Sequence, residues 1–310
     1  GVTILALGGL FLPLLLKEGY SKTFSLGLVT AAGSLGLLFP PSLPLILYAL
    51  TAGISVKSVF LAGLLPGLIR VGIVSIWAVW QGRSHSISTH KFNLSKAKIA
   101  FMEAKWEVLI PFFILFGIFG GFTTLVETAA ITVIYVVTVE VIVYKDLRWK
   151  DLVKISNECG TLIGGVLIIL GVAMGLTSFL VDAQVPLQLL EWVKANISSK
   201  FVFLIMLNIF LLAIGCMMDI FSAIIISVPL IAPIGAYFGI DPIHLAIIFI
   251  ANLELGFLTP PVGMNLFLSA YRFDEDMPTI YKSTIPFFVA MLLSVIAVTY
   301  IPILSIWVTN

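Results

Sequence analysis

Long runs of apolar residues, separated by short polar segments, dominate the chain. The runs cover residues 55–80, 106–122, 125–144, 159–181, 201–217, 220–235, 243–258 and 284–308. Because a helix of about 20 apolar residues spans the hydrocarbon core of a bilayer, runs of this kind predict membrane helices. The pattern therefore predicts an all-α polytopic membrane protein.

The composition supports a membrane protein rather than a soluble one. Hydrophobic residues make up 60% of the chain and charged residues only 11%, whereas a soluble domain carries about 25% charged residues. The formal net charge is +1, and no clustered basic face is visible, so a nucleic-acid partner is not expected. Cys159 and Cys216 stand in apolar surroundings without a CxxC motif, and we interpret both as packing residues.

Basic residues collect in two segments, 81–105 and 145–154. They are Arg83, Lys91, Lys96, Lys98 and Lys105 in the first, and Lys145, Arg148, Lys150 and Lys154 in the second. Under the positive-inside rule both segments are expected to be cytoplasmic loops, with the crossings 106–122 and 125–144 between them. The amphipathic stretch 185–197 is expected to lie along the outer surface.

The chain contains an internal repeat with a register of 220 residues, since Pro13 aligns with Pro233. Other aligned positions are Gly19 with Gly239, Ala31 with Ala251, Gly36 with Gly256, and Pro40–Pro41 with Pro260–Pro261. An odd number of crossings is expected between the copies: 22–51, 57–80, 106–122, 125–144 and 155–181. An odd number inverts the second copy. Inverted repeats with interrupted helices are typical of secondary transporters that bind substrate near the middle of the membrane.

Two short apolar segments before the second broken helix are expected to form a re-entrant hairpin. Residues 201–217 and 220–235 each hold about 16 apolar residues, which is short for a full crossing. Asp219 and Ser222 at their junction predict a hairpin tip near mid-membrane, buried in protein or facing water. In the first copy only the returning arm, about residues 2–16, is expected. Because the chain starts without Met or a signal-peptide pattern, the natural protein is expected to begin upstream.

The paired prolines predict an interruption in each broken helix. Proline has no N–H group, so Pro40 and Pro41 are expected to leave the carbonyls of Gly36 and Leu37 without helical donors. Free carbonyls at the negative end of a half-helix suit a small hard cation. The second break repeats the pattern with Pro260, Pro261, Gly256 and Phe257. The alternative is a pair of simple proline kinks whose backbone groups bond to neighbouring hydroxyl groups.

Beyond each break, the second half-helix is expected to begin with proline at its first positions. Its unpaired N–H groups would then point positive charge at an anion. Thr259, immediately before Pro260–Pro261, is expected to be the N-cap. Each break would thus offer a cation site beside an anion site, and two symmetric breaks would form a compact central pocket.

Polar side chains cluster around the predicted breaks. They are Ser34 and Ser42 at the first break, and Asn252, Glu254, Thr259 and Asn265 at the second. Glu254 could neutralise a cation, hold the unwound loop or carry a proton; a structural or indirect role is favoured because its repeat counterpart, Ser34, has no charge. Arg70 lies deep in an apolar run and needs a partner that the sequence does not identify.

Three stretches carry a resemblance to a known family. They are "GVTILALGG" at the start, "SLGLLFPPSLPLILYALTAG" at the first break and "NLELGFLTPPVGMNLFLSAYRF" at the second. With "FTTLVETAA" between them, they resemble the large membrane (M, DctM-like) subunit of the tripartite ATP-independent periplasmic (TRAP) transporters, essentially to Asn310. The resemblance is closest to members that handle sialic acid or related carboxylates.

The resemblance implies a sodium-driven importer of organic acids, such as sialic acid or C4-dicarboxylates, that works by an elevator movement. Sodium would be the coupling ion, and neither an organic cofactor nor an enzymatic activity is implied. The implied partners are a small membrane (Q) subunit, a periplasmic substrate-binding protein (the P subunit), a carboxylate substrate and the lipid bilayer. The implied location is the bacterial inner membrane.

The resemblance also implies a division of the chain. Residues 1–53 would end the first inverted repeat, and 201–273 would form the second hairpin and broken helix; together they belong to the transport domain. Residues 54–200 would be connecting and scaffold helices, and 274–310 the last transmembrane helix. The family's N-terminal helices and the tip of its first hairpin are missing, except for Gly1.

The chemistry expected at the two helix breaks, together with the family resemblance, suggests two sets of candidate residues. The sodium set is Gly1, Ser34, Gly36, Leu37, Asn252, Glu254, Gly256 and Phe257. The substrate-binding set is Ser42, Asp219, Ser222, Thr259 and Asn265. Two other classes of function stay open: a channel or another inverted-repeat carrier, and an intramembrane enzyme. The enzyme is disfavoured because the sequence shows no paired catalytic residues in adjacent spans.

Overall fold

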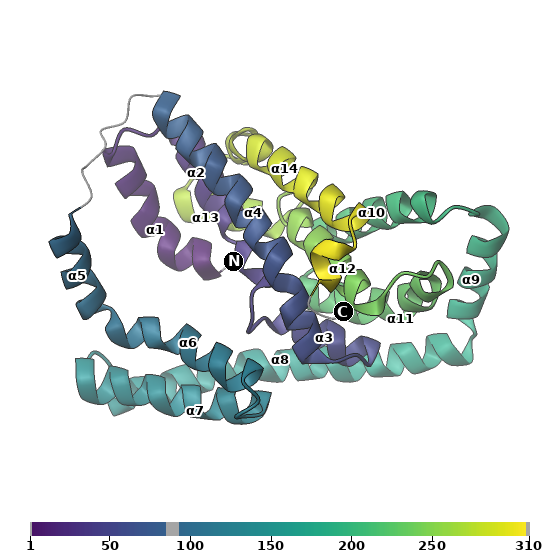
Figure 1. Cartoon of the computed structure of the whole chain (residues 1–310), viewed down its shortest axis with the longest axis horizontal. Helices are drawn as coiled ribbons and strands as arrows, with labels where there is room; N and C mark the ends of the chain where they lie inside the picture. The colour runs from purple at the N-terminus through teal and green to yellow at the C-terminus, as the bar shows by residue number, and fades with distance from the viewer. Residues whose placement is uncertain (1, 85–92, 308–310) are drawn as a thin grey trace. The chain divides into compact units, whose positions relative to one another are not determined.

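The computed structural model describes residues 2–84 and 93–307, and these residues form helices without strands. They divide into two compact units, residues 1–88 with 172–310, and residues 89–171. The larger unit holds α1 (Val2–Lys17), α2 (Lys22–Ala32), the short 3₁₀ helix η1 (Leu35–Leu38), α3 (Leu43–Ala52), α4 (Val56–Ser84), α9 (Val185–Asn196), α10 (Lys200–Met217), α11 (Ile220–Tyr237), α12 (Pro242–Gly256), α13 (Met264–Phe273), α14 (Met277–Tyr300) and α15 (Ile303–Ile306). Figure 1 labels α1 to α4 and α9 to α14 along the chain.

The smaller unit is built from α5 (Leu94–Glu103), α6 (Lys105–Phe119), α7 (Leu125–Thr138), the π-helical turn η2 (Val139–Tyr144) and the first part of α8 (Trp149–Asp182). Thr124 and Glu127 form a capping box that starts α7: the Glu127 carboxylate accepts a hydrogen bond from the Thr124 N–H at 2.7 Å. The Tyr135 hydroxyl donates to the carbonyl of Trp106 at 3.0 Å and ties α7 to α6.

The repeat seen in the sequence is visible as two matching series of helices. In the 220-residue register, α1 to α4 correspond to α11 to α14, and Pro66 inside α4 also aligns with Pro286 inside α14. The two series exchange partners: α2 packs on α14 and α12 on α4, while α1 packs on α13 and α11 on α3. Figure 1 shows α2, α4 and α14 side by side.

Helix α12 forms the core of the larger unit. Every residue from His244 to Gly256 is buried, and the helix packs against α3, α4, α10, α11 and α14. A helix that is apolar on all sides is stable only when neighbours cover all of them. α12, the first half of the second broken helix, is therefore enclosed by neighbouring helices, including its polar residues Asn252 and Glu254.

Within residues 2–84 and 93–307, five helices are long and apolar enough to cross a membrane: Val56–Gly82, Leu125–Tyr144, Lys200–Met217, Ile220–Tyr237 and Met277–Tyr300. The pair Lys22–Leu38 and Leu43–Ala52, bent by 42°, would make a sixth. These spans agree with the predicted multi-pass membrane protein. The last apolar run, 284–308, is offset from its helix: α14 starts at Met277 and stops at Tyr300, before Pro302, and it lies within the segment 274–310 expected to hold the last transmembrane helix.

Two predicted cytoplasmic loops are partly helical. In 81–105, α4 continues to Ser84 and α5 occupies Leu94–Glu103, started by Asn93, whose side chain accepts from the Lys96 N–H at 3.2 Å. The predicted loop 145–154 already contains the start of α8. Lys91 lies outside the described residues. The predicted crossing 106–122 is also shorter, since α6 spans the 15 residues Lys105–Phe119.

The arms of the predicted hairpin are longer than expected. α10 and α11 have 18 residues each: α10 starts at Lys200, one residue before its apolar run, behind the N-cap Ser199, and α11 continues to Tyr237, two residues beyond its run. Both arms are long enough to cross a membrane. Arm length therefore no longer argues for a re-entrant hairpin, which stays a prediction that depends on the polar junction at Asp219.

Candidate functional site

The first break separates α2 from α3 by a 3₁₀ turn and an extended linker that holds Pro40 and Pro41 in a cis peptide bond. The predicted free carbonyl of Gly36 is wrong, because it accepts the Phe39 N–H at 3.1 Å. The chain tightens into a 3₁₀ turn, in which the donor lies three residues ahead. Leu37 differs: the residues three and four ahead are Pro40 and Pro41, so its carbonyl has no helical donor.

The second break has the same cis Pro260–Pro261 bond, but its carbonyls are paired. Gly256 accepts the Thr259 N–H at 2.9 Å, and Phe257 accepts the Asn265 N–H at 3.2 Å. The predicted free carbonyls are therefore wrong for both residues, although Phe257 has lost its helical donor as expected. The donor to Phe257 comes from the start of α13, which folds back onto the end of α12. Each carbonyl keeps a second lone pair, so cation binding by either stays a prediction.

The second half-helices begin after the proline pairs, not with them. α3 starts at Leu43 behind Ser42, and α13 starts at Met264 behind Gly263, whose φ is 50°. The predicted prolines at the first helical positions are therefore wrong, although Pro44 lies in the first turn of α3. Thr259 is not an N-cap: its hydroxyl donates to the Leu255 carbonyl at 3.0 Å.

A buried polar network joins the two broken helices. The Asn265 amide donates to the Thr30 carbonyl at 3.3 Å, and the Thr30 hydroxyl donates to the Ser269 hydroxyl at 2.8 Å. All three side chains are fully buried. Among the described residues, the side-chain oxygen of Asn265 has no partner. The structure thus places Asn265 between the breaks, and adds Thr30 and Ser269, which the sequence analysis missed.

Asn252 belongs to a second network that ties α12 to two neighbours. Its amide donates to the Asn208 oxygen in α10 at 2.6 Å and to the Ile248 carbonyl at 2.8 Å. The same Asn208 oxygen accepts from the Thr299 hydroxyl in α14 at 3.2 Å. The side-chain oxygen of Asn252 has no partner within the described part of the chain.

Glu254 pairs with Arg70 of α4. One carboxylate oxygen bonds to the guanidinium, which also donates to the Ala251 carbonyl at 2.8 Å. Both charged side chains are fully buried. Arg70 lies deep in an apolar run, where a charged side chain needs a partner, and Glu254 is that partner. The ion pair also agrees with the favoured structural role of Glu254. A direct sodium contact by Glu254 stays a prediction.

The junction of α10 and α11 lies against the second break. The Gly263 N–H donates to the Cys216 carbonyl at 3.0 Å. Asp219, just beyond, caps α11: one carboxylate oxygen accepts from the N–H groups of Phe221 and Ser222, and the other from the Ser222 hydroxyl at 2.5 Å. Asp219 and Ser222 are thus positioned by each other, and substrate contact by either stays a prediction.

Gly256 and Gly215 allow α12 and α10 to touch through their backbones. A Cβ on Gly256 would lie 2.6 Å from the Gly215 carbonyl carbon. Gly256→Ala is therefore expected to push the helices apart and to cost about 1–3 kcal/mol of stability, measured as a lower unfolding temperature. Gly36→Ala is the matched control, because no atom lies within 4 Å of its Cβ position. Equal unfolding temperatures for the two variants would contradict the contact.

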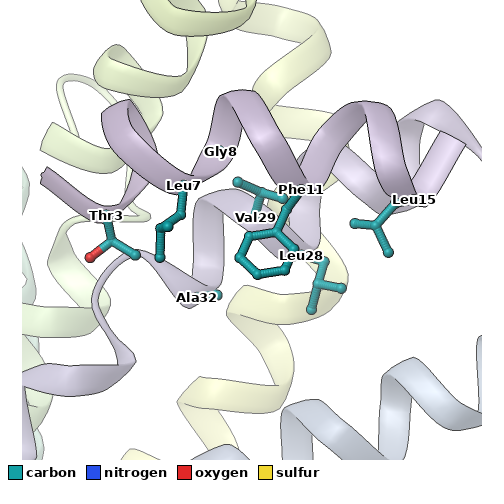
Figure 2. A pocket seen from close by; sticks show the side chains of 8 residues that line it. All are labelled: Thr3, Leu7, Gly8, Phe11, Leu15, Leu28, Val29 and Ala32. Carbon is teal, nitrogen blue, oxygen red and sulfur yellow. The ribbon is translucent and has the colours of Figure 1, made fainter. Parts of the chain in front are cut away.

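An apolar groove of about 370 Å³ lies between α1 and α2 (Figure 2). Its lining residues are Thr3, Leu7, Gly8, Phe11, Leu15, Leu28, Val29 and Ala32. Thr3 supplies the sole polar side chain, so the groove suits a hydrocarbon surface and not a carboxylate. The predicted site residues do not line it. In the 220-residue register, the face of α2 that lines this groove corresponds to a face of α12 that includes Asn252. That face of α12 is covered by α10.

The two breaks are held together by contacts between their flanking elements. α12 packs against η1 and α3 of the first break, and α2 packs against α13 of the second. The elements that carry the predicted residues of the two breaks therefore pack against each other. The α10–α11 junction lies against the second break. Gly1, predicted to contribute to the sodium site, lies outside the described residues.

Comparisons with known proteins give a consistent picture. The sequence profile described as "Tripartite ATP-independent periplasmic transporter, DctM component" matches residues 2–304. The chain is 33% identical over 309 residues to the C4-dicarboxylate TRAP transporter large permease protein DctM of Pseudomonas aeruginosa, covering 99% of the chain and 72% of that protein.

Two further relatives are named for other compounds, isethionate and ectoine. The chain is 31% identical over 302 residues to the isethionate TRAP transporter permease protein DctMQ of Oleidesulfovibrio alaskensis, covering 97% of the chain but 48% of that protein. It is 28% identical over 309 residues to the ectoine TRAP transporter large permease protein TeaC of Halomonas elongata, covering 99% of the chain and 72% of that protein. The chain thus spans between 48% and 72% of the length of these relatives.

Proposed function

Because the chain belongs to the DctM family of tripartite ATP-independent periplasmic transporters, we propose that it is the membrane-embedded translocation subunit of a sodium-coupled importer of organic acids. The observation that carries the proposal is the pair of matching helix breaks, packed against each other in the core of the larger unit. Interrupted helices in corresponding positions of two repeats are the usual place of a transporter's binding site.

The proposed substrate is a small organic acid. The names of the relatives carry C4-dicarboxylate, isethionate and ectoine, and each of these compounds has a carboxylate or sulfonate group. An anionic group suits the N-terminal ends of α3 and α13, where the helix dipole favours negative charge. At the start of α13 the N–H groups of Asn265 and Leu266 already donate to carbonyls, so the dipole is the main contribution there. Sialic acid, to which the sequence resemblance pointed, stays one candidate among such acids.

The proposed coupling ion is sodium, held by oxygen atoms at the breaks. The Leu37 carbonyl lacks a helical donor, and the side-chain oxygens of Ser42, Asn252 and Asn265 are buried without a partner within the described residues. Hard cations take neutral and charged oxygen ligands, and the carbonyl end of a half-helix adds a negative dipole. This set of acceptors supports sodium without requiring the Glu254 carboxylate, which Arg70 already engages.

The proposed mechanism is an elevator movement with inverted repeats. The exchanged packing of α2 with α14 and of α12 with α4 supports a twofold relation between the copies. We place the protein in the bacterial inner membrane, with a small membrane (Q) subunit and a periplasmic binding protein (P subunit) as partners, as the family's tripartite name indicates. An enzymatic role is disfavoured because the named relatives are transporter permeases.

Uptake into proteoliposomes tests the proposed function. The full natural chain, reconstituted with its small membrane subunit, should accumulate one of a panel of acids when an inward sodium gradient and the binding protein are both supplied. The panel contains sialic acid, a C4-dicarboxylate, isethionate and ectoine. Omitting either the gradient or the binding protein should abolish accumulation. Equal uptake without the binding protein would instead favour a channel or a carrier of another family.

A further inference from the structure

One face of α4 contacts both helix breaks. Gly63 faces the Leu38 carbonyl so closely that a Cβ would clash with it, and a Cβ on Gly67 would lie 2.9 Å from the Phe39 ring. One turn later, Arg70 bonds to Glu254 and to the Ala251 carbonyl in the last turns of α12. Spacings of four and three residues put these side chains on one face of a helix. α4 therefore connects the first break to the second.

The two ends of this connection differ in chemistry. At the first break the backbone of α4 touches the linker directly, because Gly63 has no side chain to hold it away. At the second break a rigid, planar guanidinium bonds to two groups of α12, a carboxylate and a carbonyl. Arginine can hold two acceptors in fixed directions, whereas lysine offers a single charged point. Arg70 thus fixes the direction of the end of α12 as well as its distance from α4.

The other repeat has no such ion pair. In the 220-residue register, Arg70 corresponds to Ala290 of α14 and Glu254 corresponds to Ser34. The packing of α14 on α2 instead includes a close approach of Gly27 to the Ser283 carbonyl. Packing alone can therefore join these helices. A buried charge pair is often no more stabilising than an apolar replacement, so stability alone does not account for its presence on one side.

We propose that Arg70 is a positioning residue that locks the end of α12 to α4 and thereby keeps the two breaks at a fixed separation. This inference rests on the proposed function, because the breaks supply the ion and substrate groups. Arg70 acts through Glu254 and Ala251 and contacts neither ion nor substrate. Without this ion pair, each break keeps its own ion- and substrate-binding groups, but the separation of the two breaks is no longer fixed.

The test removes both charges together, because removing one would leave the other buried and unpaired. The variant is Arg70→Met with Glu254→Gln in the full natural chain with its partners. The matched control is Lys154→Met with Glu158→Gln, which removes an exposed ion pair on α8. Arg70→Lys is the second test variant: it keeps the charge and the fold, but cannot hold both acceptors as the guanidinium does.

Hydrogen exchange of the backbone amides tests whether Arg70 positions the two breaks, and it needs no transport assay. In the double variant, exchange should be about tenfold faster both at residues 257–263 and at residues 35–39, which Arg70 does not touch. Arg70→Lys should show the same pattern to a smaller extent, and the control should show none. Faster exchange confined to residues near 251–263 would overturn the proposal, because it would mean that the pair acts only on α12.

Sodium dependence of uptake reports the consequence for the site. The half-saturating sodium concentration should rise about fivefold or more in the double variant, with the amount of inserted protein unchanged. An unchanged sodium response would contradict the positioning role. If the double variant does not fold, Arg70→Lys decides both measurements. If the unaltered protein shows no sodium dependence, the proposed function fails, while the exchange measurement still decides whether Arg70 couples the breaks.

Discussion

Arg70→Met as a single change is expected to destabilise the folded protein by about 3–5 kcal/mol. The change leaves the Glu254 carboxylate fully buried without its partner, and an uncompensated charge inside the protein has no water to solvate it. The measurement is the yield of folded protein in membranes and its unfolding temperature in detergent. Adding Glu254→Gln should recover most of the loss, since it removes the unpaired charge.

The recovery is the informative part of this comparison. Equal stability of the single and double variants would show that Glu254 does not need Arg70, and would contradict the buried pair. Lys22, whose ammonium group pairs with Glu275, supplies a control of the same kind, because its side chain is 59% exposed. Lys22→Met should cost no more than about 1 kcal/mol, as surface pairs do.

Replacing Pro40–Pro41 by Ala–Ala is expected to weaken sodium dependence much more than membrane insertion. The two new N–H groups lie three and four residues beyond Leu37, so either can donate to its carbonyl and continue the helix through the break. We expect the half-saturating sodium concentration to rise about tenfold or more, within the range of measured coupling between sites. Initial uptake rates at equal amounts of inserted protein provide the measurement.

The same change at Pro260–Pro261 should also weaken sodium dependence, but for a different reason. The carbonyls of Gly256 and Phe257 already accept N–H groups from Thr259 and Asn265. New donors would replace these bonds, straighten the linker and draw Asn265 away from the Thr30 carbonyl that it now contacts at 3.3 Å. Pro13→Ala, inside α1 and outside the linker of either break, is the control and should leave the sodium response unchanged.

The positions of the breaks were predictable because they depend on local backbone chemistry. Proline pairs interrupt a helix wherever they occur, and both interruptions lie where the sequence placed them. The donors at the breaks were not predictable in the same way. The 3₁₀ turn at Gly36 uses a donor one residue nearer than the α-helix does, and the donor to Phe257 comes from Asn265, beyond the prolines.

Pairings over long distances along the chain could not be predicted from the sequence pattern. Arg70 and Glu254 are 184 residues apart, and periodicity within one helix carries no information on which other helix it meets. The pattern showed that both residues were buried and charged, and therefore in need of partners. It did not show that each is the other's partner. Asn208 and Thr30 were missed because an uncharged polar residue within a helix does not by itself indicate that it has a distant partner.

The lengths of the two hairpin arms were slightly underestimated at opposite ends. α10 begins one residue before its apolar run, at Lys200, because Ser199 caps it with a side-chain hydrogen bond to the Phe201 N–H, and a hydrophobicity count leaves out such a polar first residue. α11 starts where its run starts, behind the cap Asp219, and instead continues two residues beyond the run to Tyr237. The shortness of the arms, which was used to argue for a re-entrant hairpin, is therefore not observed.

The most direct test of a sodium site at the paired breaks is a sodium titration of acid uptake in proteoliposomes. It compares the unaltered permease, Pro40–Pro41→Ala–Ala and Pro13→Ala, each with the partner subunits and at equal inserted amounts. We predict sodium-dependent uptake for the unaltered protein and Pro13→Ala, and a half-saturating concentration about tenfold higher for the double variant. A double variant whose uptake responds to sodium as the unaltered protein does would contradict the proposed site.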